Sequence, residues 1–276
     1  MNALEIRGLT KRRGDFALQG LDLTLPAGCI MGLIGENGAG KSTTIRLILN
    51  ALSRDGGTVA VYGKDNRALT PLEREDIGAV LDEVGLPEYM TARQIGRMMA
   101  GIFARWQPEV YRDYLRRLAL PEDKPFKDFS RGMRMRLGLA AALSHQPKLL
   151  LLDEATSGLD PVVRDDILTI LSDFTRDEEH AVLISSHIVS DLEKICDYIA
   201  FLHRGRLLLC EEKDRLTEEY GILRGTTEGI EPAAVCGQRA TPYGTEYLLR
   251  RSAVPAGVPL GQVNIEDLFV FMAKEA

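Results

Sequence analysis

The sequence GLIGENGAGKST, which runs from Gly32 to Thr43, decides the fold of this chain. It follows the apolar residues 29–31 and precedes residues 44–49, in which apolar side chains recur at helical spacing. This context predicts a strand, a glycine-rich loop and a helix in succession, with the helix extending to about Leu52. The stretch also fits the P-loop or Walker A pattern G-x-x-x-x-G-K-[ST], at Gly35, Gly40, Lys41 and Ser42. The alternative is a glycine-rich turn that happens to precede a lysine.

The residue types of this motif suit the binding of phosphate groups together with Mg²⁺. Glycines leave backbone N–H groups free to surround phosphate oxygens, and the N-terminus of the following helix adds a positive partial charge. Lys41 is placed to reach the β- and γ-phosphates of a nucleotide, and the Ser42 hydroxyl to coordinate Mg²⁺. The predicted nucleotide-binding residues of the loop are Gly35, Glu36, Asn37, Gly38, Ala39, Gly40, Lys41, Ser42 and Thr43.

Length and composition indicate an ordinary globular protein. The 276 residues suffice for one large α/β domain with an appendage, and 45% of them are hydrophobic and 27% charged. With a net charge of −6, the chain lacks the excess of basic residues that is typical of nucleic-acid-binding proteins, so no nucleic acid partner is expected. The four cysteines lie far apart without metal-binding spacing, which favours core thiols in a reducing compartment.

The sequence carries no recognisable targeting or membrane-spanning segment. A strand-like alternation begins at residue 4, which leaves no room for a signal peptide. The longest apolar runs fall far short of the ~20 residues that span a bilayer. We therefore expect a soluble chain, whose role at a membrane would depend on a partner.

The order of the remaining patterns predicts an α/β fold of P-loop NTPase type, with a mainly parallel sheet and a β-rich N-terminal part. Residues 91–145 have helical spacing, with helices expected to begin near Thr91, Pro108 and Ser130, and Pro161 opens a further helix. The first of these helices is expected to carry Ile102 on its apolar face. The expected strands are 4–9, 18–25, 58–62, 77–81, 148–153, 181–185 and a hairpin over 198–210.

The composition changes after residue 210. Glycine and proline become frequent there, and residues 264–273 again show helical spacing, with Asn264 as a candidate cap. We therefore predict a main domain over 1–210 and a small C-terminal extension over 211–276.

A second group of residues supports the assignment of the P-loop. Residues 149–152 are leucines without alternation, which is typical of a buried parallel strand, and Asp153 and Glu154 follow at its end. In a P-loop ATPase such a strand ends beside the loop, where Asp153 can hold Mg²⁺ and Glu154 can polarise the attacking water.

With these motifs in place, residues 1–210 resemble the nucleotide-binding subunit of an ATP-binding cassette (ABC) transporter. The resemblance implies an ATPase that binds ATP and Mg²⁺ and drives transport by ATP-dependent closure of a head-to-tail dimer. The motifs that carry it are Walker A at Gly35–Thr43, a signature-like FSRGM at 129–133, Walker B at 149–154, a D-loop SGLD at 157–160, and a switch histidine at His187.

The resemblance also implies roles for single residues. Ser130 and Gly132, at a helix N-terminus, would cap the γ-phosphate of ATP bound to the opposite subunit. Asp160 would communicate across the dimer, and His187 would hydrogen-bond the γ-phosphate and the attacking water. Ser130 and Asp160 could equally be plain helix caps, and His187 alone could be a surface histidine. The implied catalytic residues are Glu154, His187 and Lys41.

Two departures concern residues near the nucleotide. In the family a glutamine usually follows the strand expected at 77–81, where it contacts Mg²⁺ and couples to the membrane partner. Here Asp82 and Glu83 follow instead, and Asp82 could still coordinate Mg²⁺. An aromatic residue usually stacks on adenine; this chain has Arg13 at that position and Phe16 close by, and either could stack.

The third departure lies in the signature. Arg131 and Met133 stand where glycine and glutamine are commoner, and we expect little effect because backbone N–H groups bind the phosphate.

The predicted function is ATP hydrolysis that powers transport, with export of a drug, peptide antibiotic or lipid favoured over import. The implied partners are a transmembrane permease, which residues 91–145 would face, and a second ATPase subunit, identical or different. The chain would then be cytoplasmic and peripheral on the inner face of the membrane. Two classes stay open, namely a soluble ABC ATPase of repair or translation, and a nucleotide-gated sensor or immunity module with little hydrolysis. The tail could be a plain extension, or regulatory, or dimer-stabilising.

Overall fold

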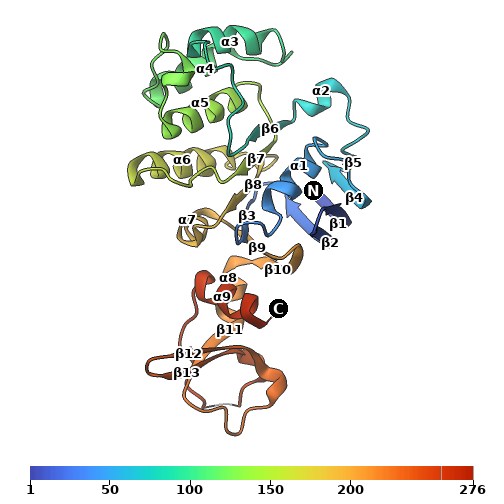
Figure 1. Cartoon of the computed structure of the whole chain (residues 1–276), viewed down its shortest axis with the longest axis vertical. Helices are drawn as coiled ribbons and strands as arrows, with labels where there is room; N and C mark the ends of the chain where they lie inside the picture. The colour runs from blue at the N-terminus through green and yellow to red at the C-terminus, as the bar shows by residue number, and fades with distance from the viewer. Residues whose placement is uncertain (256, 276) are drawn as a thin grey trace.

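The computed structural model of the chain describes residues 1–255 and 257–275. The molecule is elongated, with the predicted helical segment and the C-terminal extension at opposite ends of its long axis (Figure 1). Two sheets lie between these ends. The expected α/β fold with a mainly parallel sheet is confirmed.

The central sheet carries the P-loop. It contains β3 (Ile30–Gly35), β6 (Ile77–Val80), β7 (Leu149–Asp153), β8 (Ala181–Ser186), β9 (Tyr198–His203) and β10 (Arg206–Glu212). The strand order is β10-β9-β3-β8-β7-β6, and every neighbouring pair is parallel except β10 with β9. Helices or the second sheet cover both faces, so the leucines of β7 are fully buried, as their uninterrupted run predicts.

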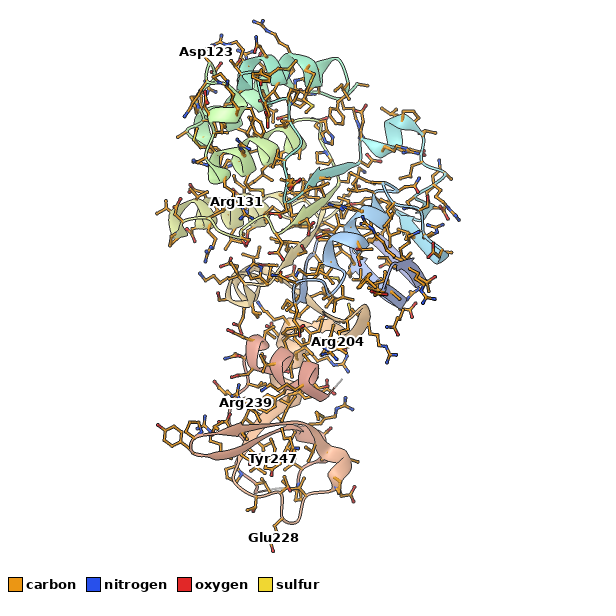
Figure 2. The ribbon with its side chains drawn as sticks, viewed as in Figure 1. Asp123, Arg131, Arg204, Glu228, Arg239 and Tyr247 are labelled. Carbon is orange, nitrogen blue, oxygen red and sulfur yellow. The ribbon has the colours of Figure 1, made fainter. Side chains whose placement is uncertain are left out.

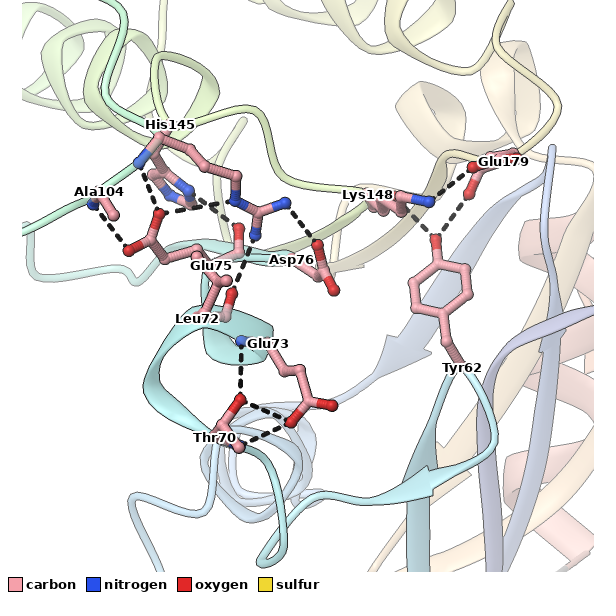
Figure 3. Close-up of polar contacts among 11 residues, drawn as sticks. Tyr62, Thr70, Leu72, Glu73, Glu75, Asp76, Ala104, His145, Lys148 and Glu179 are labelled. Atoms are coloured by element: carbon pink, nitrogen blue, oxygen red, sulfur yellow. Dashed lines mark hydrogen bonds and ion pairs between the residues drawn. The ribbon is translucent and has the colours of Figure 1, made fainter.

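The second sheet is antiparallel and forms the β-rich N-terminal part. Its strands are β1 (Asn2–Arg13), β2 (Phe16–Pro26), β4 (Gly56–Val61) and β5 (Lys64–Asp65), in the order β2-β1-β4-β5. The Tyr62 hydroxyl lies 2.7 Å from the Glu179 carbonyl oxygen and 3.0 Å from that of Lys148 (Figure 3). This contact joins the end of β4 to the segments that lead into the central strands.

Helices on the two faces of the central sheet belong to different cores. The helix α1 (Lys41–Ile48) packs with the antiparallel sheet, whereas α6 (Pro161–Phe174) and α7 (Val189–Ile195) pack on the other face. The prediction that α1 extends to about Leu52 is wrong. Asn50 adopts a left-handed backbone with φ of +53°, which cannot continue an α-helix.

The helical segment contains α3 (Ala92–Ala100), α4 (Pro108–Arg117), a 3₁₀ turn (Phe126–Asp128) and α5 (Arg131–Leu143). Thr91 caps α3 in a reciprocal box with Gln94, and Ser130 caps α5, as the sequence predicts. The expectation that Ile102 lies on the buried face of the first helix is wrong. Gly101 ends α3, and Ile102 is 62% exposed.

A buried carboxylate fastens the helical segment to the central sheet. The helix α2 (Pro71–Arg74) precedes Glu75, whose carboxylate accepts the backbone N–H groups of Ala104 at 2.8 Å and Arg105 at 2.9 Å (Figure 3). Burial raises the pKa of Glu75, but these bonds and the Arg105 guanidinium outweigh it and lower that pKa below its usual value. The Arg105 side chain also donates to Asp76 at 2.7 Å. The junction is therefore held by charge-assisted bonds.

The C-terminal extension has a sheet of its own, in the order β11-β13-β12. Its elements are α8 (Lys213–Glu219), β11 (Tyr220–Arg224), a 3₁₀ turn (Pro232–Ala234), β12 (Val235–Thr241), β13 (Gly244–Arg250), a 3₁₀ turn (Arg251–Ala253) and α9 (Ile265–Glu275). The predicted cap of the last helix is confirmed, since the Asn264 side chain accepts the Asp267 N–H at 2.7 Å. The Phe269 ring meets Phe201 edge-on at 5.3 Å, which joins α9 to the central sheet.

Two further sequence expectations bear on the chain as a whole. The cysteines are all unpaired thiols within the described residues, and burial raises the pKa of Cys196, which lies in the core. In residues 1–255 and 257–275, every helix is too short or too polar to span a bilayer.

Candidate nucleotide-binding site

The P-loop connects β3 to α1 and contains glycines where no side chain fits. A Cβ atom on Gly35 would lie 2.4 Å from the Leu202 carbonyl oxygen. Gly40 has φ of +114°, and a Cβ atom there would lie 2.8 Å from the Phe16 ring. Gly40 also caps α1 without a side-chain hydrogen bond, so the first N–H groups of this helix are available to an anion.

Lys41 is buried and folded back over its own loop. Its Nζ atom donates to the carbonyl oxygen of Gly35 at 2.7 Å and lies 3.3 Å from that of Glu36. It also lies 3.0 Å from the Oε1 atom of Glu154, so the two motifs meet in an ion pair. The ammonium group therefore sits where a phosphate-binding lysine is needed, with a carboxylate as its present partner.

Glu154 lies at the centre of a short polar network. Its Oε2 atom is 2.7 Å from His187 Nδ1, and its backbone N–H donates to the carbonyl and hydroxyl oxygens of Ser185, each at 3.1 Å. The Ser185 hydroxyl in turn donates to Asp153 Oδ1 at 2.7 Å. Because β7 and β8 are parallel neighbours, their carboxyl ends bring these four residues together at one edge of the sheet.

A cavity of about 410 Å³ opens over the P-loop. It gathers most of the residues that the sequence assigns to the nucleotide, including Arg13 and Phe16 from the β1–β2 hairpin and Asp82 after β6. Asp153 lies deeper, being 2% exposed, and His187 reaches the site through Glu154. The cavity is lined by Arg13, Phe16, Glu36, Asn37, Gly38, Gly40, Lys41, Ser42, Thr43, Asp82 and Glu154.

Ser130, Gly132 and Asp160 lie apart from this cavity. Ser130 accepts the Met133 N–H at 3.3 Å and Asp160 accepts the Val163 N–H at 3.0 Å, so both are helix caps. The described residues that line the P-loop cavity include none of the three. Their roles toward ATP of an opposite subunit stay predictions.

Asp82 has a partner that the sequence did not indicate. Its Oδ1 atom accepts a hydrogen bond from Arg131 Nη2 at 2.7 Å. Arg131 is the first residue of α5, where the helical segment meets the rest of the molecule (Figure 2). The Mg²⁺ role of Asp82 therefore stays a prediction, and its carboxylate contacts an arginine of the signature.

Sequence reasoning missed two other residues of the site. The sequence pattern places Ser185 only in the strand before His187, although a hydroxyl at the carboxyl end of a buried strand is a signal for a site residue. His203 is 5% exposed, and its Nδ1 atom lies 3.1 Å from Glu36 Oε1. Nothing in the sequence places β9 beside the P-loop, so that contact had no local signal.

Comparison with known proteins agrees with this geometry. The ABC transporter family matches residues 18–157. The chain is 33% identical to the uncharacterized ABC transporter ATP-binding protein YhcH of Bacillus subtilis, over 93% of this chain and 87% of that protein. It is 32% identical to the bacitracin transport ATP-binding protein BcrA of Enterococcus faecalis, over 82% and 73% of the two chains. A solved ATP-binding subunit of an ABC transporter superposes with a TM-score of 0.72 at 25% identity, over 78% and 92%. The chain therefore belongs to the ABC transporter family, as an ATP-binding and ATP-hydrolysing subunit.

Proposed function

We propose that this ATPase powers the export of a peptide antibiotic, drug or lipid through a separate transmembrane permease. The observation that supports ATP hydrolysis as the energy source is the contact of Glu154 with both Lys41 and His187 at the P-loop. The direction of transport rests on relatives. BcrA is named for bacitracin transport, and others are named for lantibiotic transport and for daunorubicin/doxorubicin resistance.

The geometry supports a definite division of labour during hydrolysis. When ATP binds, Lys41 would pair with the β- and γ-phosphates in place of the Glu154 carboxylate. Glu154 would then be free to accept the proton of the attacking water. His187, 2.7 Å from Glu154, would orient that carboxylate and contact the γ-phosphate.

A magnesium ion fits the oxygen-rich donors beside the P-loop. The Ser42 hydroxyl and the Asp153 carboxylate would hold it, since Mg²⁺ prefers hard oxygen ligands. When bound, the ion neutralises charge on the β- and γ-phosphates. Ser185 supports this role because its hydrogen bond at 2.7 Å fixes one carboxylate oxygen of Asp153.

A second ATPase subunit would complete the site. Ser130 and Gly132 at the start of α5, and Asp160 at the start of α6, would contact ATP bound to that subunit.

An apolar groove supports docking of the permease on the helical segment. A cavity of about 300 Å³ lies between the end of β6 and the helices α3 and α5, with Val80, Met99 and Phe103 in its wall. Ile102, which precedes Phe103 in the chain, and Leu72 on α2 are 62% and 57% exposed, although both are large apolar side chains. A permease segment inserted there would hold the chain at the inner face of the membrane.

The C-terminal residues 211–276 would act as a folded extension of the ATPase domain over 1–210. Its own sheet and the Phe269–Phe201 contact support this division. A regulatory or dimer-stabilising role for the extension remains compatible with its position away from the P-loop (Figure 1).

Export is tested by expressing the chain together with its permease in bacteria that are sensitive to bacitracin, a lantibiotic and daunorubicin. We expect increased resistance to at least one compound, and loss of that resistance in Lys41→Ala, because the lysine supplies the charge that binds the triphosphate. Equal resistance with Lys41→Ala would show that ATP does not drive the effect. Unchanged sensitivity to all three, with intact ATPase activity, would contradict the proposed substrate classes.

A further inference from the structure

Two departures from the family pattern form a single contact in this molecule. Asp82 stands where a glutamine is usual and Arg131 where a glycine is usual, and the two side chains are joined at 2.7 Å. They are about half exposed, at 51% and 53%. Such an exposed pair contributes little to folding stability. Its effect on the charge near the P-loop is therefore the property of interest.

The pair links the signature to the P-loop cavity. Asp82 lines the P-loop cavity and also a neighbouring cavity of about 730 Å³ that Arg131 lines. A Cβ atom on Gly158 of the D-loop would lie 3.1 Å from Arg131 Nη1. Arg131 therefore lies close to the D-loop as well as against Asp82.

The charges of the P-loop cavity explain why Asp82 needs a partner. Its lining contains two cationic residues, Arg13 and Lys41, and three carboxylates, Glu36, Asp82 and Glu154, so the carboxylates outnumber the cations. A triphosphate entering this cavity meets a net negative wall, which weakens binding. Asp82 is the carboxylate that has an arginine from outside the lining against it.

We propose that Arg131 is a positioning residue for nucleotide binding. It neutralises Asp82 and holds that carboxylate on the signature helix, so that Asp82 does not repel the phosphates. The proposal rests on the nucleotide site described above. It assigns a role within the same chain to a signature residue, in addition to any contact with ATP of a second subunit.

The test measures nucleotide affinity of the isolated full chain in buffer without Mg²⁺, using fluorescent N-methylanthraniloyl ATP and ADP. Arg131→Ala should weaken ATP binding about fivefold or more and ADP binding less, because repulsion grows with phosphate charge. Added salt should reduce the difference. Asp82→Asn should bind ATP at least as tightly as the wild type, and should restore affinity when combined with Arg131→Ala. Arg131→Lys should keep most of the affinity.

A second ion pair provides a matched control. Arg117 on α4 and Asp173 on α6 are joined at 3.0 Å, are 46% and 36% exposed, and lie outside the P-loop cavity. Arg117→Ala should leave both affinities unchanged. If Arg131→Ala does not fold, the ATP affinities of Asp82→Asn, Arg131→Lys and the wild type still test the proposal.

Three results would overturn the proposal. These are unchanged ATP affinity in Arg131→Ala, equal weakening of ATP and ADP, or a double variant no better than Arg131→Ala alone. If one of these results is found while Lys41→Ala loses ATP binding, the assignment of the nucleotide site stands and only the role of Arg131 is rejected. Unchanged binding in Lys41→Ala would instead reject the nucleotide site itself.

Discussion

Replacing Glu154 by glutamine should change hydrolysis and binding in opposite directions. Glutamine has the shape of glutamate but cannot accept the proton of the attacking water, so hydrolysis should slow by roughly 10²- to 10⁴-fold. The same substitution removes the ion pair that engages Lys41 at 3.0 Å, and it removes one negative charge from the cavity. ATP should therefore bind more tightly.

The gain in affinity follows from the geometry of that pair. The Lys41 and Glu154 side chains are only 6% and 14% exposed, so at an effective dielectric constant of about 20 their attraction is roughly 5 kcal/mol before desolvation. Desolvation offsets most of this attraction, and the amide dipole of glutamine would still attract the Lys41 ammonium group. A net change of about 1 kcal/mol remains, which corresponds to ATP binding roughly fivefold more tightly.

The assay combines titration with fluorescent ATP, single-turnover hydrolysis, and size-exclusion chromatography of the chain without its permease. If Ser130 and Gly132 cap ATP of a second subunit, blocked hydrolysis should accumulate a dimer with Mg-ATP and leave a monomer without nucleotide. Glu179→Gln is the control, because Glu179 pairs with Lys148 at 2.6 Å and lies outside the P-loop cavity. Hydrolysis within tenfold of the wild type would refute the role of Glu154. A variant that binds ATP but stays monomeric would refute the sandwich dimer.

Two further predictions concern stability. Ser185→Ala should lower the free energy of unfolding by about 1–3 kcal/mol in urea titrations, because the buried Asp153 carboxylate loses its donor; an unchanged urea midpoint would contradict this. Hydrogen bonds from Arg239, and to a smaller extent from Arg224, lower the pKa of Glu246 below its usual 4.5. The ionised Glu246 carboxylate therefore stabilises the folded state above pH 4.5, and this contribution is lost as the pH falls through the lower, folded-state pKa. Urea midpoints measured between pH 6 and pH 3 should show this loss, and Arg239→Gln should reduce it; equal acid sensitivity in the variant would exclude Glu246 as the source.

The parts of the fold that could be predicted have local signals. The P-loop is a contiguous pattern with its strand and helix on either side, and the helix starts at Thr91 and Ser130 depend on side chains within a few residues. The end of α1 was misplaced because periodicity alone does not reveal the left-handed backbone of Asn50.

The extension was harder to predict, because its sheet does not follow simple alternation. Glu246 faces α9 from within the sheet and is paired with Arg239 and Arg224, at 2.7 Å and 2.9 Å. Arg239 continues to Asp267 of α9 and also lies over the Phe271 ring, 4.8 Å from its centroid. Glu246 therefore occupies a buried position on β13 that a hydrophobic pattern would reserve for the core.

The contact of Asp82 with Arg131 shows why single-position comparison failed at the site. An aspartate in place of glutamine adds a negative charge beside a phosphate-binding loop, and an arginine in place of glycine adds a positive charge on the signature helix. Taken separately, the first suggests a changed metal ligand and the second a tolerated side chain. Because the two groups lie 2.7 Å apart, each charge offsets the other. Neither departure can therefore be interpreted without its partner, and only the fold shows that residues so far apart in sequence are neighbours.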